Sequence, residues 1–306
     1  MRDRLSRREL LAAAAGAAAA FALAGCGRSE VEAEAKPPRR KPRPPKLAVA
    51  SEKNPAASTR AAVAAVGGMS AFVSKGDFVV IKPNIAFGRT PEQAATTNPE
   101  VVATLVRLCK DAGAADILII DHTIDRPADM VLAMSGIKEA AEKAGARVDA
   151  GRDESMYQRI EIPGGKVLTS DQVLKDVLKA DVFINVPIAK VHGEAKLTLG
   201  MKNLMGINWN RQAWHQNGLH QCIADLAGAV RPDLVVLDAT RILLTNGPKG
   251  PGQTKDVGQV IAGTDQVAVD AYGATLFGMK PDDIEHIRLA HAAGVGEIDF
   301  RKFKVS

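Results

Sequence analysis

Polar residues capable of binding or proton transfer follow four apolar segments of the chain. The segments are "DFVVI", "DILII", "DVFIN" and "DLVVL". Amines, carboxylates, amides and imidazoles come directly after them, and these side chains can bind anions, exchange protons or hold a metal. In chain order they are Lys82 and Asn84, then Asp121, then Lys190 and His192, then Asp238 with the turn Asn246-Gly247-Pro248-Lys249.

The four apolar segments are typical of strands buried on both faces of a parallel sheet. They alternate with helical patterns, which predicts right-handed crossovers and a doubly wound, mostly parallel α/β sheet with helices on both faces. We predict strands at 46–50, 78–82, 117–121, 147–150, 159–162, 182–186, 234–238 and 258–262. We predict helices at 57–72, 98–112, 136–144, 171–178, 197–204, 218–230, 265–277 and 281–292, and a small inserted hairpin or subdomain at 152–166.

This architecture predicts where a ligand would bind. Open parallel sheets bind ligands outside the carboxyl ends of their strands, where these polar residues lie. Each has a plainer interpretation: Asp121 and Asp238 could cap the next element, Lys82 could be a solvated strand end, and Asn246-Gly247-Pro248 could be only a turn. Their convergence on one edge favours a pocket.

Two chemistries suit such a pocket. Lysines at its floor would bind a carboxylate or phosphate. Alternatively, aspartates and histidines could hold a divalent metal, although the chain has no His-Glu-x-x-His and five residues turn a helix by about 140° between His215 and His220. The lysines are Lys82, Lys190 and Lys202; the metal candidates are Asp121, Asp238 and Asp270 with His192, His215 or His220.

Helical geometry limits the segment 197–204. Lys202 and Asn203 are adjacent, and adjacent residues point about 100° apart on a helix. We therefore expect one of the two to face the pocket directly, but not both. We expect Lys190 and His192 to act from a loop.

Several standard motifs are absent from the sequence. There is no Gly-x-Gly-x-x-Gly, no Walker A and no Gly-x-Ser-x-Gly, which disfavours a standard dinucleotide enzyme, a P-loop ATPase or a serine hydrolase. No Cys-x-x-Cys is present, so no iron–sulfur or structural zinc framework is predicted. Cys109 and Cys222 could pair in an oxidising compartment, but the sequence cannot place the two sulfurs together.

The N-terminal segment predicts export and lipid anchoring. Paired arginines in Ser6-Arg7-Arg8-Glu9-Leu10-Leu11 and an Ala-rich apolar run resemble a twin-arginine signal, and Leu23-Ala24-Gly25-Cys26 resembles a lipobox with Cys26 as the lipidated residue. An uncleaved anchor helix or a plain signal peptide is the alternative. We predict a signal over 1–26, a disordered Pro-rich and basic tether over 27–46, and one α/β domain over 47–306 on the extracytoplasmic face of a membrane.

The net charge of +5 belongs to this N-terminal segment. Of 40 Lys/Arg and 35 Asp/Glu in the chain, residues 1–46 hold 11 and 5, which leaves 29 and 30 for the rest. The body is therefore close to neutral, which gives no support to nucleic-acid binding. The expected partners are the twin-arginine export machinery, the membrane and a small-molecule ligand.

The body resembles a known family. "VVIKPNI", "TTNPEVVATLVRLCKDAGAADILIID", "VPIAKVHGEAKLTLGMKNLMGI", "DLVVLDATRILLTNGPKGPG" and "VIAGTDQVAVDAYGATLFG" are similar, in order, to the DUF362 family, a domain of unknown function of bacteria and archaea. Some relatives carry a ferredoxin-like iron–sulfur segment, whose cysteines this chain lacks. The family motif positions fall on Lys82, Asn84, Lys190, His192, Lys202, Asn203, Asp238, Asn246, Gly247, Pro248, Asp265 and Asp270.

The resemblance implies a site but no reaction. We expect an exported enzyme acting on a small carboxylate or phosphate; the alternatives are a ligand- or cofactor-binding lipoprotein and a metal-dependent accessory of a redox complex. No particular cofactor is predicted. The expected catalytic residues are Lys190, His192, Lys202, Asp238 and Asp121, and the expected substrate-binding residues are Lys82, Asn84, Asn203, Asn246, Gly247, Lys249 and Asp270.

Overall fold

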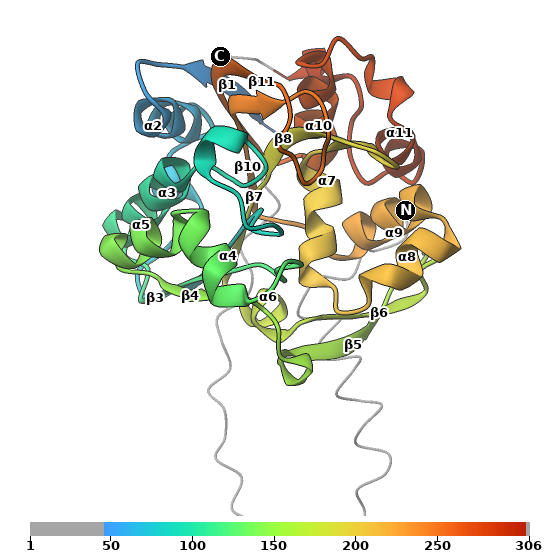
Figure 1. The fold of residues 1–306 in the computed structure, drawn as a ribbon, viewed down its shortest axis with the longest axis horizontal. Coiled ribbons are helices and arrows are strands. Elements are labelled where there is room, and N and C mark those ends of the chain that lie inside the picture. The colour runs from blue at the N-terminus through green and yellow to red at the C-terminus, as the bar shows by residue number, and fades with distance from the viewer. Residues whose placement is uncertain (1–45, 304–306) are drawn as a thin grey trace, which may run out of the picture.

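The computed structural model describes residues 46–303, which form a central sheet covered by helices (Figure 1). The predicted signal, Cys26 and the tether up to residue 45 lie outside the described residues. The sheet has nine strands, and seven of them follow the order β1-β11-β10-β7-β2-β3-β4. Its strands are β1 Leu47–Ser51, β2 Phe78–Pro83, β3 Asp116–Ile120, β4 Arg147–Asp149, β7 Val182–Val186, β8 Ile188–His192, β9 Lys196–Thr198, β10 Leu234–Leu243 and β11 Thr254–Gly263.

The centre of the sheet is parallel, as the apolar runs predicted. β10, β7, β2, β3 and β4 pair in parallel, whereas β11 runs antiparallel to both β10 and β1. Every residue of β7 is buried, because helices cover both faces of the sheet there. The mixed α/β class with a mostly parallel sheet is thus confirmed.

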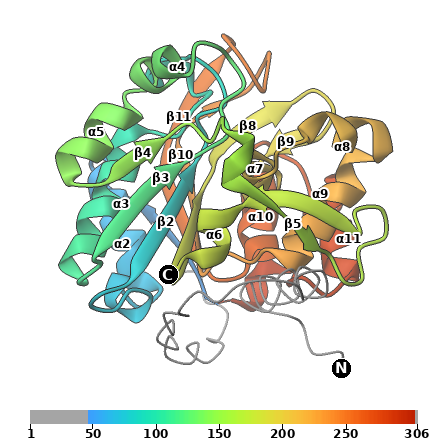
Figure 2. The same cartoon turned by 90° about the horizontal axis from the view of Figure 1, so that it is seen from below.

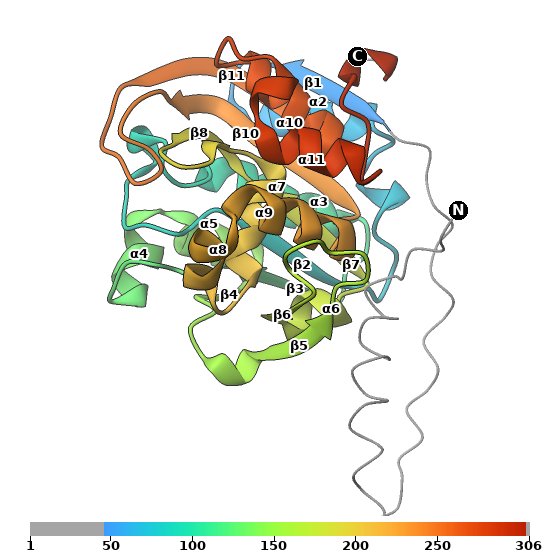
Figure 3. The ribbon, with the colours of Figure 1, turned by 90° about the vertical axis from the view of Figure 1, so that its right-hand side faces the viewer.

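Alternation along the strands divides the core into two layers (Figure 2). Val79 and Ile81 of β2 pack into one hydrophobic cluster, and Val80 between them packs into the other. The first layer is covered by α2 Pro55–Ala65, α3 Pro99–Asp111, α4 Ala128–Met134 and α5 Ile137–Ala144. The second is covered by α6 Lys175–Lys179, α7 Gly200–Asn203, α8 Arg211–Asn217, α9 Leu219–Ala229, α10 Gln266–Thr275 and α11 Glu285–Ala292 (Figure 3).

Helix α3 shows how local sequence sets an element's ends. The Asn98 side chain accepts the N–H of Glu100 at 2.9 Å, and Pro99 stands at the first helical position. Gly113 follows the helix with a φ of +96°, a conformation that glycine adopts without strain. The predicted start at Asn98 and end near Ala112 are confirmed.

The inserted hairpin is longer than predicted. β5 Tyr157–Glu161 and β6 Ser170–Leu174 form a separate antiparallel pair, so the first half of the helix predicted at 171–178 is a strand. Asp225 of α9 stabilises the turn between these strands, because its Oδ2 accepts hydrogen bonds from three consecutive backbone N–H groups, from Lys166 to Leu168, at 2.8–3.0 Å. The short 3₁₀ helices are Met69–Ala71, Pro91–Gln93, Glu154–Met156, Leu204–Ile207, Pro281–Asp283 and Phe300–Lys302.

The two body cysteines do not pair. Cys109 and Cys222 are buried free thiols, and each lies in a different hydrophobic cluster, on opposite faces of the sheet. Between residues 46 and 303, no helix is long and apolar enough to cross a membrane.

A large-to-small substitution in β7 tests the account of the core. Ile184 is completely buried, so Ile184→Ala should lower the free energy of unfolding by about 2–5 kcal/mol through lost burial and the cavity left behind. Val167→Ala, at a side chain that is 43% exposed, is the control and should change it by less than about 0.5 kcal/mol. Urea denaturation measures both; equal effects would contradict the layer assignment.

Candidate functional site

A cavity of about 420 Å³ opens at the carboxyl ends of β2 and β3, next to β8 and α7. This is the edge of the sheet where the sequence predicted a pocket. Its lining residues are Lys82, Asn84, Ala86, Phe87, Asp121, Ile124, Lys190, His192, Thr198, Lys202, Asn203, Met205, Gly206, Arg211, Gln212, His215 and Pro248.

A buried ion pair forms one wall of the cavity. Lys82 Nζ lies 2.8 Å from Asp121 Oδ1 and donates to Asn203 Oδ1 at 2.8 Å and to the Pro83 carbonyl at 2.9 Å. The other carboxylate oxygen of Asp121 accepts the N–H of Ile85 at 2.6 Å. Burial lowers the pKa of Lys82, and the neighbouring Asp121 carboxylate opposes that shift.

Amide side chains connect this pair to a second lysine. Asn84 Nδ2 donates to Asn203 Oδ1 at 2.9 Å, and Asn84 Oδ1 accepts from Lys190 Nζ at 3.0 Å. Lys190 Nζ also donates to the Ala95 carbonyl at 2.6 Å. Burial, and then the charge of Lys202, lower the pKa of Lys190 to about 7, so its amine gains and loses a proton near neutral pH.

The third lysine has the poorest hydrogen bonding of the three. Lys202 is 8% exposed, and within residues 46–303 its Nζ makes a single hydrogen bond, to the thioether sulfur of Met205 at 3.1 Å. Burial, followed by the charges of Arg211 and Lys82, lowers its pKa to about 7. Lys82, Lys190, Lys202 and Arg211 therefore share the cavity with one lining carboxylate, which leaves up to three positive charges uncompensated among the lining residues.

Helix α7 positions Lys202 through a buried carboxylate behind it. Asp270 of α10 accepts the N–H groups of Gly200 and Met201 at 2.6 and 2.9 Å. A Cβ on Gly200 would lie 2.7 Å from Asp270 Oδ1, so glycine allows this close contact. Burial raises the pKa of Asp270 to about 7. Asp270 was predicted to bind substrate, but the structure places it behind the helix and outside the cavity lining.

Two local predictions about this region are wrong. Lys202 and Asn203 both line the cavity: Asn203 hydrogen-bonds to Lys82 and Asn84 in one wall, and Lys202 Nζ bonds to Met205, which also lines it. Lys190 and His192 lie on strand β8 and not in a loop; β8 pairs with β9 in a hairpin that the sequence did not reveal. Since residues i and i+2 of a strand share a face, both reach the cavity.

The histidines take different places. His192 lines the cavity, and its Nδ1 accepts the N–H of Ala195 at 3.1 Å; burial, then the charges of Lys202 and Lys190, lower its pKa to about 3. His215 also lines the cavity, and its Nδ1 lies 2.5 Å from Glu194 Oε2. His220 lies outside the lining and stacks on His286, with ring centroids 5.5 Å apart.

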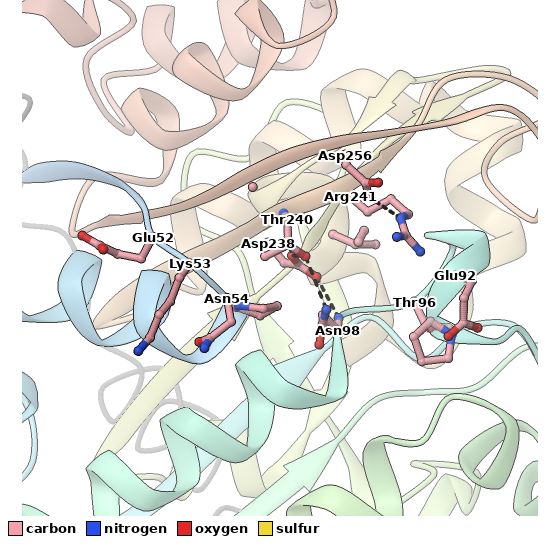
Figure 4. Close-up of a pocket in the computed structure, with 14 residues that line it drawn as sticks. Glu52, Lys53, Asn54, Glu92, Thr96, Asn98, Asp238, Thr240, Arg241 and Asp256 are labelled. Carbon is pink, nitrogen blue, oxygen red and sulfur yellow. Dashed lines mark hydrogen bonds and ion pairs between the residues drawn. The ribbon is translucent and has the colours of Figure 1, made fainter.

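Asp238 belongs to a second, smaller cavity of about 330 Å³ (Figure 4). Its Oδ2 accepts the N–H of Asn98 at 2.7 Å, and its Oδ1 accepts the N–H and hydroxyl of Thr240 at 3.0 and 2.7 Å. Burial raises the pKa of Asp238. We predicted that the strand ends at Asp238, whereas β10 continues to Leu243, so this carboxylate lies within a strand and does not line the larger cavity.

The loop after β10 contributes only part of what was predicted. Pro248 lines the cavity, whereas Asn246, Gly247 and Lys249 do not. Asn246 donates to the Pro251 carbonyl at 3.1 Å, and Lys249 pairs with Asp125 at 3.0 Å. A Cβ on Gly247 would lie 1.9 Å from the Val191 carbonyl, so this glycine lets the loop pack on β8.

Several lining residues were missed by sequence reasoning. Arg211 follows Asn210, the N-cap of α8, a helix that we did not predict. Gly206 had a signal, since it ends the Lys-Asn-x-x-Gly spacing that begins at Lys202. A Cβ there would lie 2.0 Å from Asp121 Oδ1 and 2.6 Å from Lys82 Nζ, so only glycine leaves room for the ion pair.

The described residues do not assemble the alternative metal site. Asp121, Asp238 and Asp270 lie in three separate surroundings, and from residue 46 to residue 303 no group of three or more His, Cys, Asp or Glu side chains is arranged to hold a metal ion. Of the two predicted kinds of site, the described residues form the cavity lined by lysines.

The buried ion pair gives a stability prediction. Asp121→Asn should lower the free energy of unfolding by about 3–5 kcal/mol, because it leaves the Lys82 ammonium buried without a counter-charge. Asp116→Asn is the matched control: it breaks the exposed pair with Arg147 and should cost about 1 kcal/mol or less. Chemical denaturation of both variants at one pH is the measurement; an equally small loss for Asp121→Asn would contradict the buried pair.

Comparison with known proteins gives the family. A protein named Thylakoid-associated protein sll1697, from Synechocystis sp. (strain ATCC 27184 / PCC 6803 / Kazusa), is 30% identical over 247 residues, covering 74% of this chain and 71% of its own length. The lactate racemase apoprotein from Thermoanaerobacterium thermosaccharolyticum superposes with a TM-score of 0.49 and 14% identity, over 75% of this chain but only 56% of that chain. The family described as Domain of unknown function (DUF362) matches residues 79–275, and this chain belongs to it.

Proposed function

We propose that this chain is an enzyme that binds a small carboxylate- or phosphate-bearing substrate in the cavity at the carboxyl ends of β2 and β3. One observation carries the proposal: four cationic side chains face that cavity with a single carboxylate among them. Burying uncompensated positive charge costs free energy, and a bound anion would restore the balance.

The donors suit an oxyanion. The Arg211 guanidinium presents a planar fork that matches carboxylate or phosphate oxygens, and the lysines add point charges. Thr198, opposite Lys190 in the β8–β9 hairpin, also lines the cavity, and its buried hydroxyl has no hydrogen-bond partner among the described residues. A ligand oxygen or amide in the cavity would satisfy that hydroxyl.

The same groups suit proton transfer. Amines whose pKa lies near 7 can act as acid or base at neutral pH, which is the condition for efficient general catalysis. The cations would also stabilise negative charge that develops on the substrate during reaction. Apolar lining from Phe87, Ile124 and Met205 leaves room for a small hydrocarbon part beside the anionic group.

Anion affinity should therefore depend on pH. Binding of an anion would raise the pKa of Lys190 and Lys202 above their free value of about 7. Above pH 7, binding would therefore be accompanied by protonation of these amines. The affinity for sulfate, whose own charge is constant in this range, should be highest below pH 7. It should fall above pH 7 by up to about tenfold per pH unit for each lysine that must be protonated. Titration calorimetry between pH 6 and 9 measures it.

Sulfate binding by two variants tests whether the anion binds in the cavity. Lys202→Ala removes a charge-assisted contact and should weaken sulfate binding by about tenfold or more. Lys196→Ala, at an exposed lysine of β9 outside the cavity, is the matched control and should bind as the parent does. Equal affinity in both variants, or no binding of sulfate, phosphate or carboxylates, would refute the proposed site. Tight binding without turnover would instead indicate a binding protein.

We also propose that the chain is exported and lipid-anchored. The twin-arginine and lipobox residues support this, and the printed name of the relative describes that protein as thylakoid-associated. β1 runs in the same direction as β10, so the chain enters the fold at Lys46, on the edge of the sheet opposite the cavity. The cavity and the point where the chain enters the fold thus lie at opposite edges of the sheet.

Fractionation of a producing bacterium tests the anchor. Replacing Arg7 and Arg8 together by lysine should retain the chain in the cytoplasm, and Cys26→Ser should release it from the membrane fraction. Mass spectrometry of the mature N-terminus should show an acylated Cys26. A protein that stays membrane-bound after Cys26→Ser would contradict the lipid anchor.

A further inference from the structure

The three buried lysines of the cavity differ in what their amines contact. Lys82 Nζ has a carboxylate, an amide oxygen and a carbonyl, and Lys190 Nζ has an amide oxygen and a carbonyl. In the described part of the chain, Lys202 Nζ has one acceptor, the Met205 sulfur at 3.1 Å. A thioether is a weak acceptor, and an ammonium carries three N–H donors that need strong ones.

These surroundings favour the neutral form of Lys202. Arg211 and Lys82 repel a charge there, and Glu194, whose attraction opposes them, is engaged by His215 at 2.5 Å. Burial adds to the repulsion and places the pKa of Lys202 at about 7. A desolvated amine beside other cations is the arrangement that activates lysine as a nucleophile.

We propose that Lys202 is a covalent nucleophile that forms an imine with the carbonyl carbon of a 2-oxo carboxylate held in the cavity. This rests on the proposed anion-binding function: Lys190 and Arg211 would hold the carboxylate, and its adjacent carbonyl would face the amine. A ligand that carries an anionic group without a carbonyl, such as a phosphate monoester or a hydroxy acid, would bind but could not react.

The step balances without an oxidant or reductant. The lone pair of the Lys202 nitrogen attacks the carbonyl carbon, and a proton moves from nitrogen to oxygen to give a carbinolamine. The carbon–oxygen bond then breaks, and the oxygen takes up the second nitrogen proton, directly or through a water molecule, and leaves as water. The resulting imine can take a proton from the Lys190 ammonium or from solvent. The positive charge then makes the neighbouring carbon bonds easier to break.

Borohydride trapping tests the proposal on the full chain purified through its export route. Pyruvate with sodium borohydride should add the mass of the reduced adduct, up to one per chain, and peptide mapping should place it on Lys202. Lactate, which has the same carboxylate without the carbonyl, should give no adduct. At saturating pyruvate, the rate of trapping should rise with pH and reach half of its maximum above the free pKa of about 7, because the amine must lose its proton and the bound carboxylate raises its pKa.

Matched substitutions separate nucleophilicity from charge. Lys202→Arg keeps a cation but no primary amine, so trapping should fall at least about tenfold while sulfate still raises the melting temperature. Lys196→Arg, the same change at an exposed lysine, should trap as the parent does.

The possible results separate the proposed Lys202 nucleophile from the proposed anion-binding function. Anion binding without an adduct, or an adduct on Lys190 or on surface lysines, would overturn the nucleophile and leave the anion pocket intact. Failure of pyruvate, lactate and sulfate alike to bind would overturn both.

Discussion

The buried Lys82–Asp121 ion pair is the constraint on which the rest of the site depends. It joins the carboxyl ends of β2 and β3, and Gly206 has no side chain because the pair occupies that space. Breaking such a pair by removing one partner costs several kcal/mol, so the surrounding chain must satisfy both groups. Asn203 does this from α7, which in turn brings Lys202 to the cavity.

Among residues 46–303, the pair uses the one carboxylate that lines the cavity, which sets the charge of the other lining residues. Lys190 and Lys202 are left in a desolvated, cationic environment, where their pKa values fall to about 7. A bound anion would reverse this shift of the pKa values, and a bound carbonyl compound would react with the neutral amine of Lys202. In the proposed function, the same imbalance would support both affinity and reactivity, because it raises the free energy of the empty pocket.

The sequence predicted the parallel sheet, its edge and seven of the residues that line the cavity, because buried strands carry a strong apolar signal. Lys82, Lys190 and Lys202 were found in this way. Long-range contacts were not predictable. Asp270 accepts hydrogen bonds from backbone N–H groups that lie 69 and 70 residues away in the sequence. The position of Asp238 depends on how far strand β10 continues, which the sequence did not indicate. The β8–β9 hairpin is too short to show its own periodicity.

A pH titration of the lysine amines by NMR, with lysine side chains labelled at Cε, measures whether the cavity holds uncompensated positive charge. We expect two lysines that titrate near pH 7 in the free protein and at clearly higher pH once sulfate is bound, with Lys190→Ala and Lys202→Ala each removing one of the two signals. Lysines that all titrate near their usual value of about 10.4, or a pair that sulfate does not shift, would contradict the claim that this pocket holds uncompensated positive charge for an anion.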